Sequence, residues 1–259
     1  MSAINLLIGE FKRTWLQTLR YPTEVIGGVV ILTAVFYGIF FSTQYMAGSV
    51  GTFGTRLDSL IVGYVTWTLV LYILNDTATS LQLEAQTGTL EQVFLSPFGA
   101  FNVFLIRAVA SLTLRLLLIL VVLGLILWIT SSQLSFPITL LLPLLTLVLA
   151  AYGLAFLAGS LALVFKRVQQ LLGIFQFVLL FLLATPTENW TGTARTVANV
   201  LPILPSIGLL RGLMARGESL DWGMWAIALI NGLAYFALGT AVFRWAERKA
   251  KRQGTLGGY

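Results

Sequence analysis

The chain has 259 residues, of which 58% are hydrophobic and only 10% are charged, whereas charged residues make up about a quarter of a soluble globular domain. This composition, with a formal net charge of +6, predicts an integral membrane protein. The absence of His and Cys excludes His-based catalytic triads, thiol nucleophiles, disulfides and the usual zinc sites. No GxxxxGK[ST] run is present, so we expect no nucleotide-phosphate loop on this chain. Together with the absence of His and Cys, this leads us to expect no catalytic residue and no metal site.

The first predicted element is an amphipathic helix over residues 2–20. Its apolar side chains recur at three- and four-residue steps, as Ile4, Leu7, Ile8, Phe11, Trp15 and Leu19, while polar side chains occupy its other faces. This spacing is typical of a helix lying in the membrane interface. Pro22 disfavours helical geometry at Tyr21, which predicts an elbow before the first span. An anchor without mechanical purpose is the alternative.

Six apolar stretches are long enough to cross a hydrocarbon core, which needs about 20 residues. They are Val25–Met46, Asp58–Ser80, Val103–Thr130, Pro137–Phe165, Val168–Thr185 and Gly223–Phe243. Lys166 and Arg167 divide the fourth span from the fifth. An even number of spans places both termini on one side of the membrane. Most Lys and Arg residues lie on that side, so the positive-inside rule predicts that it is cytoplasmic.

A polar segment, residues 81–102, separates the second and third spans. Thr89 and Gln92 have the spacing of a helix capping box, and Pro97 discourages helical continuation. They delimit a short helix that carries the apolar side chains of Leu90, Val93 and Phe94. So short a helix is marginal alone in water, which favours packing against another surface. The local pattern leaves a docking element and a simple connector equally open.

Residues 186–222 form the longest predicted exterior segment, and its middle is apolar but interrupted by Pro202 and Pro205. A re-entrant or interfacial pair of short helices fits this pattern better than a crossing, because a crossing would move the basic tail, residues 244–259, to the outside. The tail is interpreted as a membrane anchor and not as a nucleic-acid site.

Polar residues inside spans are candidates for function because burying them in lipid is costly. Arg107 and Arg115 are eight residues apart on the third span, near one face, so Asp76 or Glu84 could neutralise one while the other reaches the interface. We interpret them as a structural ion pair in preference to a substrate site. Gln176 either bonds a neighbouring helix or lines a pathway, and Asn231 is a further candidate, in the last span.

Two local patterns, together with the order of elements, resemble the permease subunits of type-two ATP-binding-cassette (ABC) exporters. Gly88-Thr89-Leu90-Glu91-Gln92 with Ser96-Pro97 is similar to the cytoplasmic signature of that family, with Glu84 just upstream. Pro202 and Arg211 match an exterior Pro and Arg nine positions apart, followed by Gly217. Leu201 and Gly208 depart from the family pattern, which usually has Asn and an acid there.

The resemblance implies a single transmembrane domain over residues 1–259 in the plasma (inner) membrane, paired with a second copy or a homologous permease. Separate ABC ATPase subunits would dock beneath it and bind ATP and Mg. The residues that the resemblance assigns to ATPase coupling are Glu84, Gly88, Thr89, Leu90, Glu91, Gln92, Val93, Phe94 and Pro97, with a smaller contact from Lys166 and Arg167. Pro202, Pro205 and Arg211 would form an exterior gate, and Trp67, Phe175 and Gln176 would contact substrate.

An aromatic passage with few charges favours an amphiphilic substrate such as a lipid, a glycolipid, a polysaccharide or a drug. An ion-gradient-driven transporter or channel is the alternative, although it would require carboxylates or broken helices near mid-membrane in paired segments. An intramembrane enzyme is a third class, disfavoured by the lack of His, Cys and paired mid-membrane carboxylates.

Overall fold

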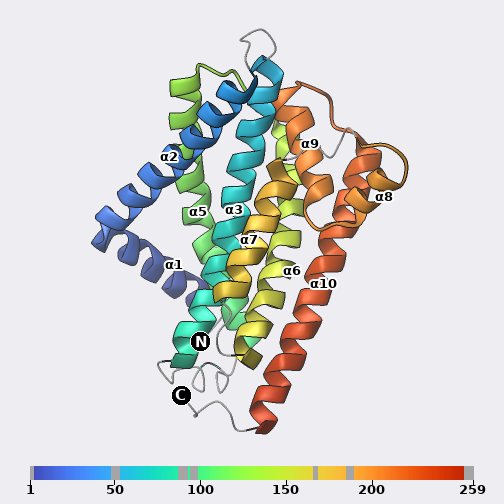
Figure 1. Ribbon diagram of the computed structural model, residues 1–259. Helices are drawn as coiled ribbons and strands as arrows, with labels where there is room; N and C mark the ends of the chain where they lie inside the picture. The colour runs from blue at the N-terminus through green and yellow to red at the C-terminus, as the bar shows by residue number, and fades with distance from the viewer. Residues whose placement is uncertain are drawn as a thin grey trace.

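The computed structural model describes residues 3–47, 53–86, 93, 99–165, 169–184 and 190–253, and across these residues the regular structure is helical, without strands. The helices are α1 (Ala3–Arg20), α2 (Pro22–Ala47), α3 (Phe53–Gln86), α5 (Ala100–Thr130), the 3-10 turn η2 (Ile138–Leu140), α6 (Leu141–Phe165), α7 (Gln169–Ala184), α8 (Gly192–Val200), α9 (Leu204–Ala215) and α10 (Trp222–Gln253) (Figure 1). The predicted all-α membrane architecture is confirmed.

Within the described ranges, five helices are long and apolar enough to cross a membrane: α2, α3, α5, α6 and α10. The predicted fifth span, Val168–Thr185, corresponds to α7, which has 16 described residues. A helix of that length rises about 24 Å, less than the roughly 30 Å of a hydrocarbon core. The chain on either side of α7, residues 166–168 and 185–189, is outside the described part.

The N-terminal elbow is confirmed, because α1 ends at Arg20 and α2 begins at Pro22. Proline suits a first helical position since it has no N–H to leave unpaired there. Helices α1 and α2 form a V on one side of the bundle (Figure 1). Apolar side chains of α1, including Leu7, Ile8 and Leu19, are exposed, as expected for a helix that lies in an interface.

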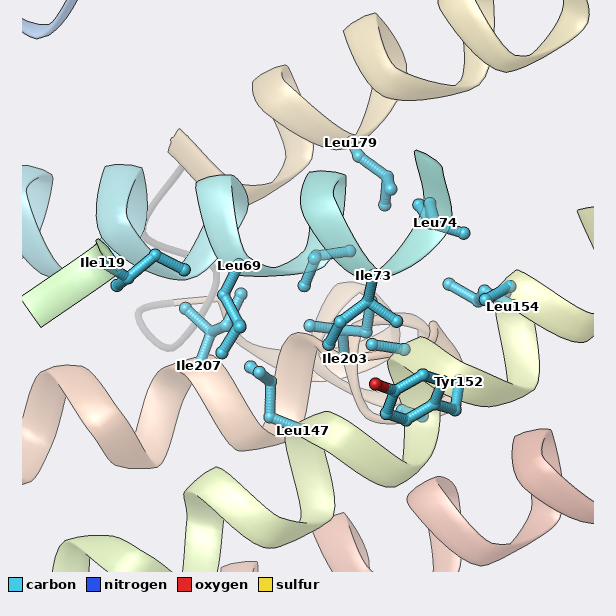
Figure 2. Close-up of a cluster of buried hydrophobic side chains, with 14 of the residues drawn as sticks. Leu69, Ile73, Leu74, Ile119, Leu147, Tyr152, Leu154, Leu179, Ile203 and Ile207 are labelled. Atoms are coloured by element: carbon cyan, nitrogen blue, oxygen red, sulfur yellow. The ribbon is translucent and has the colours of Figure 1, made fainter. Parts of the chain in front are cut away.

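Helix α3 lies at the centre of the bundle and contacts α5, α6, α7 and α9. Figure 2 shows Leu69, Ile73 and Leu74 of α3 facing Leu147, Tyr152 and Leu154 of α6, Leu179 of α7, and Ile203 and Ile207 at the start of α9. The 34 residues of α3 extend about 50 Å. The helix is therefore longer than the hydrocarbon core is thick. Its C-terminal end, which carries Glu84, is expected to extend beyond the core.

Helices α6 and α10 form the most extensive helix pair in the described part of the bundle. A Cβ added to Gly153 would overlap the carbonyl of Tyr235, and one added to Gly239 would overlap the carbonyl of Gly153. A Cβ on Gly232 would come within 2.7 Å of the Thr146 carbonyl oxygen. The two backbones touch along a seam of glycines, which is how membrane helices gain close packing without a hydrophobic driving force.

Helices α8 and α9 meet at an angle of 103°, and both lie in the half of the bundle opposite α1 (Figure 1). We call this half the α9 end and the opposite half the α1 end. The arrangement agrees with the predicted re-entrant pair. The turn between them includes Ile203, which has φ +73° and is fully buried. A β-branched residue rarely adopts positive φ, so the surrounding packing holds the turn in a strained conformation.

The basic C-terminal segment begins inside a helix. The 32-residue α10 continues to Gln253, so residues 244–253 of the predicted tail extend the last span. The Arg244 guanidinium lies over the Phe101 ring, 4.8 Å from its centroid. This cation–π contact attaches the end of α10 to the start of α5.

Candidate functional site

An ionic junction joins three helices at the α1 end. Arg107 of α5 donates from Nε to Oε1 of Glu10 on α1, at 3.0 Å, and from Nη1 to Oε1 of Glu84 on α3. Arg13 lies 3.5 Å from the other oxygen of Glu10. The junction links the interfacial helix to the two helices that flank residues 87–98. It identifies Glu84 as a structural partner, whatever else it does.

Glu10 was not predicted as a partner of Arg107. The signal was present, because Glu10 is the single carboxylate of residues 2–20. What sequence could not supply was the position of α1 beside α5, which depends on the elbow at Tyr21.

A second ion pair lies about two helical turns farther along α3 and α5 from the α1 end. Arg115 of α5 makes a bidentate contact with Asp76 of α3, with both nitrogen–oxygen distances at 2.8 Å. The guanidinium also lies 4.6 Å from the ring centroid of Tyr72. The predicted structural ion pair is therefore present, but the expectation that one arginine reaches the interface alone is wrong. Both arginines have carboxylate partners, because α3 presents Asp76 and Glu84 eight residues apart and matches the spacing on α5.

Polar side chains join α3 to α7 at the predicted pathway residues. The side-chain amide of Gln176 donates to Oδ1 of Asn75 at 2.7 Å, and the Trp67 indole N–H donates to the Gln176 carbonyl at 3.3 Å. Phe175 is half-buried against the core. Of the two interpretations of Gln176, bonding to a neighbouring helix is what the structure contains. A role of Trp67, Phe175 and Gln176 in substrate contact stays a prediction.

The predicted exterior gate residues surround the elbow between α8 and α9. Pro202 lies in the turn and Pro205 in the first turn of α9. Arg211 is 1% exposed, and its Nε donates to the carbonyl of Ser59 at 3.2 Å. It thus fastens α9 to the start of α3.

Asn231 donates hydrogen bonds to backbone carbonyls at the end of α8, in the elbow between α8 and α9. Its amide nitrogen lies 3.0–3.1 Å from the carbonyl oxygens of Asn199, Val200 and Leu201, and the Tyr235 hydroxyl donates to Val200 at 3.1 Å. The last carbonyls of a helix have no intrahelical partner. At membrane depth they must find a protein donor or water, and α10 supplies donors for α8.

Most of the predicted coupling element falls outside the described residues. Gly88, Thr89, Leu90, Glu91, Gln92, Phe94 and Pro97 belong to this group, as do Lys166 and Arg167. Val93 is described; it is helical and packs, half-buried, against the core. The ends on either side are held together, since the Arg107–Glu84 pair connects α5 to α3.

Two cavities accompany these features. At the α9 end, a partly open pocket of about 210 Å³ lies between α8, α9 and the start of α10. At the α1 end, about 760 Å³ lies between α1, α3 and α5 and is lined by both ion pairs. Among the described residues, no group of three or more His, Cys, Asp or Glu side chains could hold a metal ion.

No protein-family model matches this chain, and a search of curated proteins found no significant match.

Proposed function

We propose that this multi-pass membrane protein is the permease subunit of an ATP-driven exporter of the type-two ABC class. In this proposal two copies, or one copy and a homologous permease, move an amphiphile across the plasma membrane. Separate ATPase subunits bind ATP and Mg. The α1 end is cytoplasmic, with both termini, and the α9 end is exterior.

The observation that carries the proposal is the Glu10–Arg107–Glu84 junction. The segment proposed to contact the ATPase connects α3 to α5, and this junction ties those two helices to each other and to α1. Charge-assisted hydrogen bonds are the stronger kind, especially where solvent is partly excluded. A displacement of the segment would therefore move three helices together.

The elbow at the α9 end supports the same proposal. The turn between α8 and α9 contains Pro202. Arg211 attaches α9 to α3, and Asn231 bonds the last carbonyls of α8. In this proposal the α8–α9 pair covers the exterior end of the bundle. Irregular backbone at membrane depth is expected only where protein shields it or a water-filled path adjoins it. A permease has such a path.

Exposed apolar faces supply room for a second copy. Almost all of the most apolar stretch of α2 is exposed, and α7 exposes Ile174, Phe177 and Phe181. Lipid or another permease could cover either face, and the proposal assigns a partner permease to part of them.

The direct test is co-expression with a candidate ABC ATPase subunit. Val93→Pro should weaken pull-down of the ATPase or uncouple ATP hydrolysis from transport, because a proline inside a helix costs about 3 kcal/mol. Glu91→Ala should have a smaller effect in the same direction. Val93→Ala is the matched control, since it removes the side chain without breaking a helix. Unchanged pull-down and coupling in the proline variant would contradict the coupling assignment.

The alternative is a carrier driven by an ion gradient, and the Asp76–Arg115 pair inside the bundle is the observation that favours it. Transport into inside-out vesicles separates the two. ATP dependence that persists in the presence of a protonophore supports the exporter. Transport that collapses with the proton gradient and does not require ATP supports the carrier.

A further inference from the structure

The cavity at the α1 end is too large and too polar to be a packing defect. Its volume of about 760 Å³ far exceeds the roughly 10–15 Å³ that a single water molecule needs. Helices α1, α3 and α5 each contribute charged or hydroxyl side chains to its lining. Empty cavities in proteins are usually apolar, whereas polar ones hold water or a ligand.

Among the described residues that line this cavity, the formal charges balance. Three arginines, Arg13, Arg107 and Arg115, line it together with three carboxylates, Glu10, Asp76 and Glu84. A ligand that carried only a negative or only a positive charge would leave the site with a net charge near the apolar part of the membrane, which is costly. A zwitterion leaves the net charge of the site at zero, because its anionic group can face the arginines while its cationic group faces the carboxylates.

The cavity retains hydrogen-bonding capacity after its internal pairs are formed. A guanidinium has five N–H donors, and the contact of Arg115 with Asp76 uses two nitrogens. The Arg13 side chain is 52% exposed and reaches Glu10 only at 3.5 Å. Among the described residues, the amides of Gln17 and Gln82, which also line the cavity, have no hydrogen-bond partner.

The location points to a lipid. The cavity extends from α1, in the interface, to Arg115, which lies 15 residues into α5 and therefore about 22 Å along that helix. The two helices α1 and α5 also carry exposed apolar side chains close in sequence to the residues that line the cavity, including Leu16 of α1 and Val109 and Leu117 of α5. Acyl chains could lie against these side chains while a headgroup occupied the polar space.

We propose that this cavity binds the phosphoethanolamine headgroup of a phospholipid from the leaflet at the α1 end. Arg13 and the remaining N–H groups of Arg107 and Arg115 would hold the phosphate, and the carboxylates would accept hydrogen bonds from the ammonium. Free phosphoethanolamine esters share this chemistry, but the exposed apolar side chains of α1 and α5 favour the lipid. The site does not depend on ATP-driven transport and would exist in any membrane protein with this cavity.

The test is native mass spectrometry of the purified full-length chain, titrated with phosphatidylethanolamine, phosphatidylcholine or phosphatidylglycerol of matched acyl chains. Phosphatidylethanolamine should bind most tightly. The quaternary ammonium of phosphatidylcholine has no N–H to donate, and phosphatidylglycerol is a net anion. The Arg13 side chain is half exposed, and solvent-exposed ionic contacts are weaker than buried ones, so Arg13→Gln should weaken phosphatidylethanolamine binding by roughly two- to fivefold.

Arg20→Gln is the matched control, because it removes the same charge from the same helix at a residue that does not line the cavity. Ser111→Leu provides a second variant, which fills the cavity without changing its charge and should also reduce binding. Equal effects of Arg13→Gln and Arg20→Gln, or tighter binding of phosphatidylglycerol, would overturn the proposal in favour of general attraction to basic side chains. Competition by soluble glycerophosphoethanolamine at concentrations equal to those of the lipid would overturn the lipid as the source.

Discussion

Several polar side chains of the bundle meet polar partners on other segments of the chain. Arg115 pairs with Asp76, and Gln176 bonds Asn75. Asn231 bonds the end of α8. Each of these contacts joins two segments far apart in the sequence, and in a low-dielectric environment such contacts orient helices that apolar packing alone would leave free to rotate.

Asn231 offers the clearest test at this scale. Asn231→Leu keeps a similarly branched side chain but leaves the carbonyls of Asn199, Val200 and Leu201 without this donor. An unpaired buried acceptor costs about 1–3 kcal/mol, so we expect a lower midpoint of thermal unfolding in detergent, followed by tryptophan fluorescence. Tyr235→Phe removes one donor whose hydrogen bond is exposed and should have a smaller effect. A leucine variant as stable as the parent would show that water satisfies these carbonyls.

At the scale of elements, the α6–α10 seam determines how closely the last span approaches the bundle. The seam depends on the absence of Cβ atoms at Gly153, Gly232 and Gly239. Contact at such short range aligns the two helices over much of their length. It thereby fixes Asn231 and Tyr235 opposite the elbow.

Gly153→Ala should destabilise the protein, because its Cβ would overlap backbone atoms of α10, which cannot move aside as a flexible side chain could. Overpacking typically costs about 1–3 kcal/mol, which would be seen as a lower unfolding midpoint. Gly124→Ala on α5 is the matched control: no atom lies within 4 Å of its added Cβ. This control should be neutral or stabilising, since alanine is the better helix former by about 1 kcal/mol. Equal stability of the two variants would mean that the seam is wider than described.

At the scale of the whole molecule, the two ends of the bundle differ in chemistry. The α1 end has ion pairs, basic side chains and the large polar cavity. The α9 end has a surface ion pair, Arg216–Glu218, beside a buried helix held by Arg211 and by backbone contacts, including the Ser135 N–H donating to the Met214 carbonyl at 2.9 Å. Such asymmetry suits a protein that meets different environments at its two ends.

Topology can be measured directly because the chain has no native cysteine. Cysteines at Gln133 and Thr193, both exposed at the α9 end, should react with a membrane-impermeant maleimide in intact cells. Cysteines at Lys12 and Arg248 should react only after permeabilisation, because basic residues favour the cytoplasmic side. Labelling of Thr193 and Lys12 from the same side would contradict the re-entrant pair.

Much of this architecture follows from composition and periodicity. Apolar stretches of span length predict membrane helices wherever they occur, because lipid leaves the backbone no partner but its own helix. The elbow at Tyr21-Pro22 and the bent pair around Pro202 and Pro205 were predictable for a related reason, since proline acts on its immediate neighbours. The coupling role of residues 81–102 stays a prediction.

By itself, the sequence determined the membrane class, the helical content, the amphipathic first helix and the bent helical pair around Pro202 and Pro205, all of which depend on local side-chain order. Only the tertiary structure decided that Glu10 joins Arg107, that Arg115 pairs with Asp76 and that Asn231 serves the end of α8. The cavity between α1, α3 and α5 likewise exists only because these three helices meet in the tertiary structure. These features require that particular faces of distant helices meet, and helix rotation and approach are set by packing over the whole bundle, which no local pattern encodes.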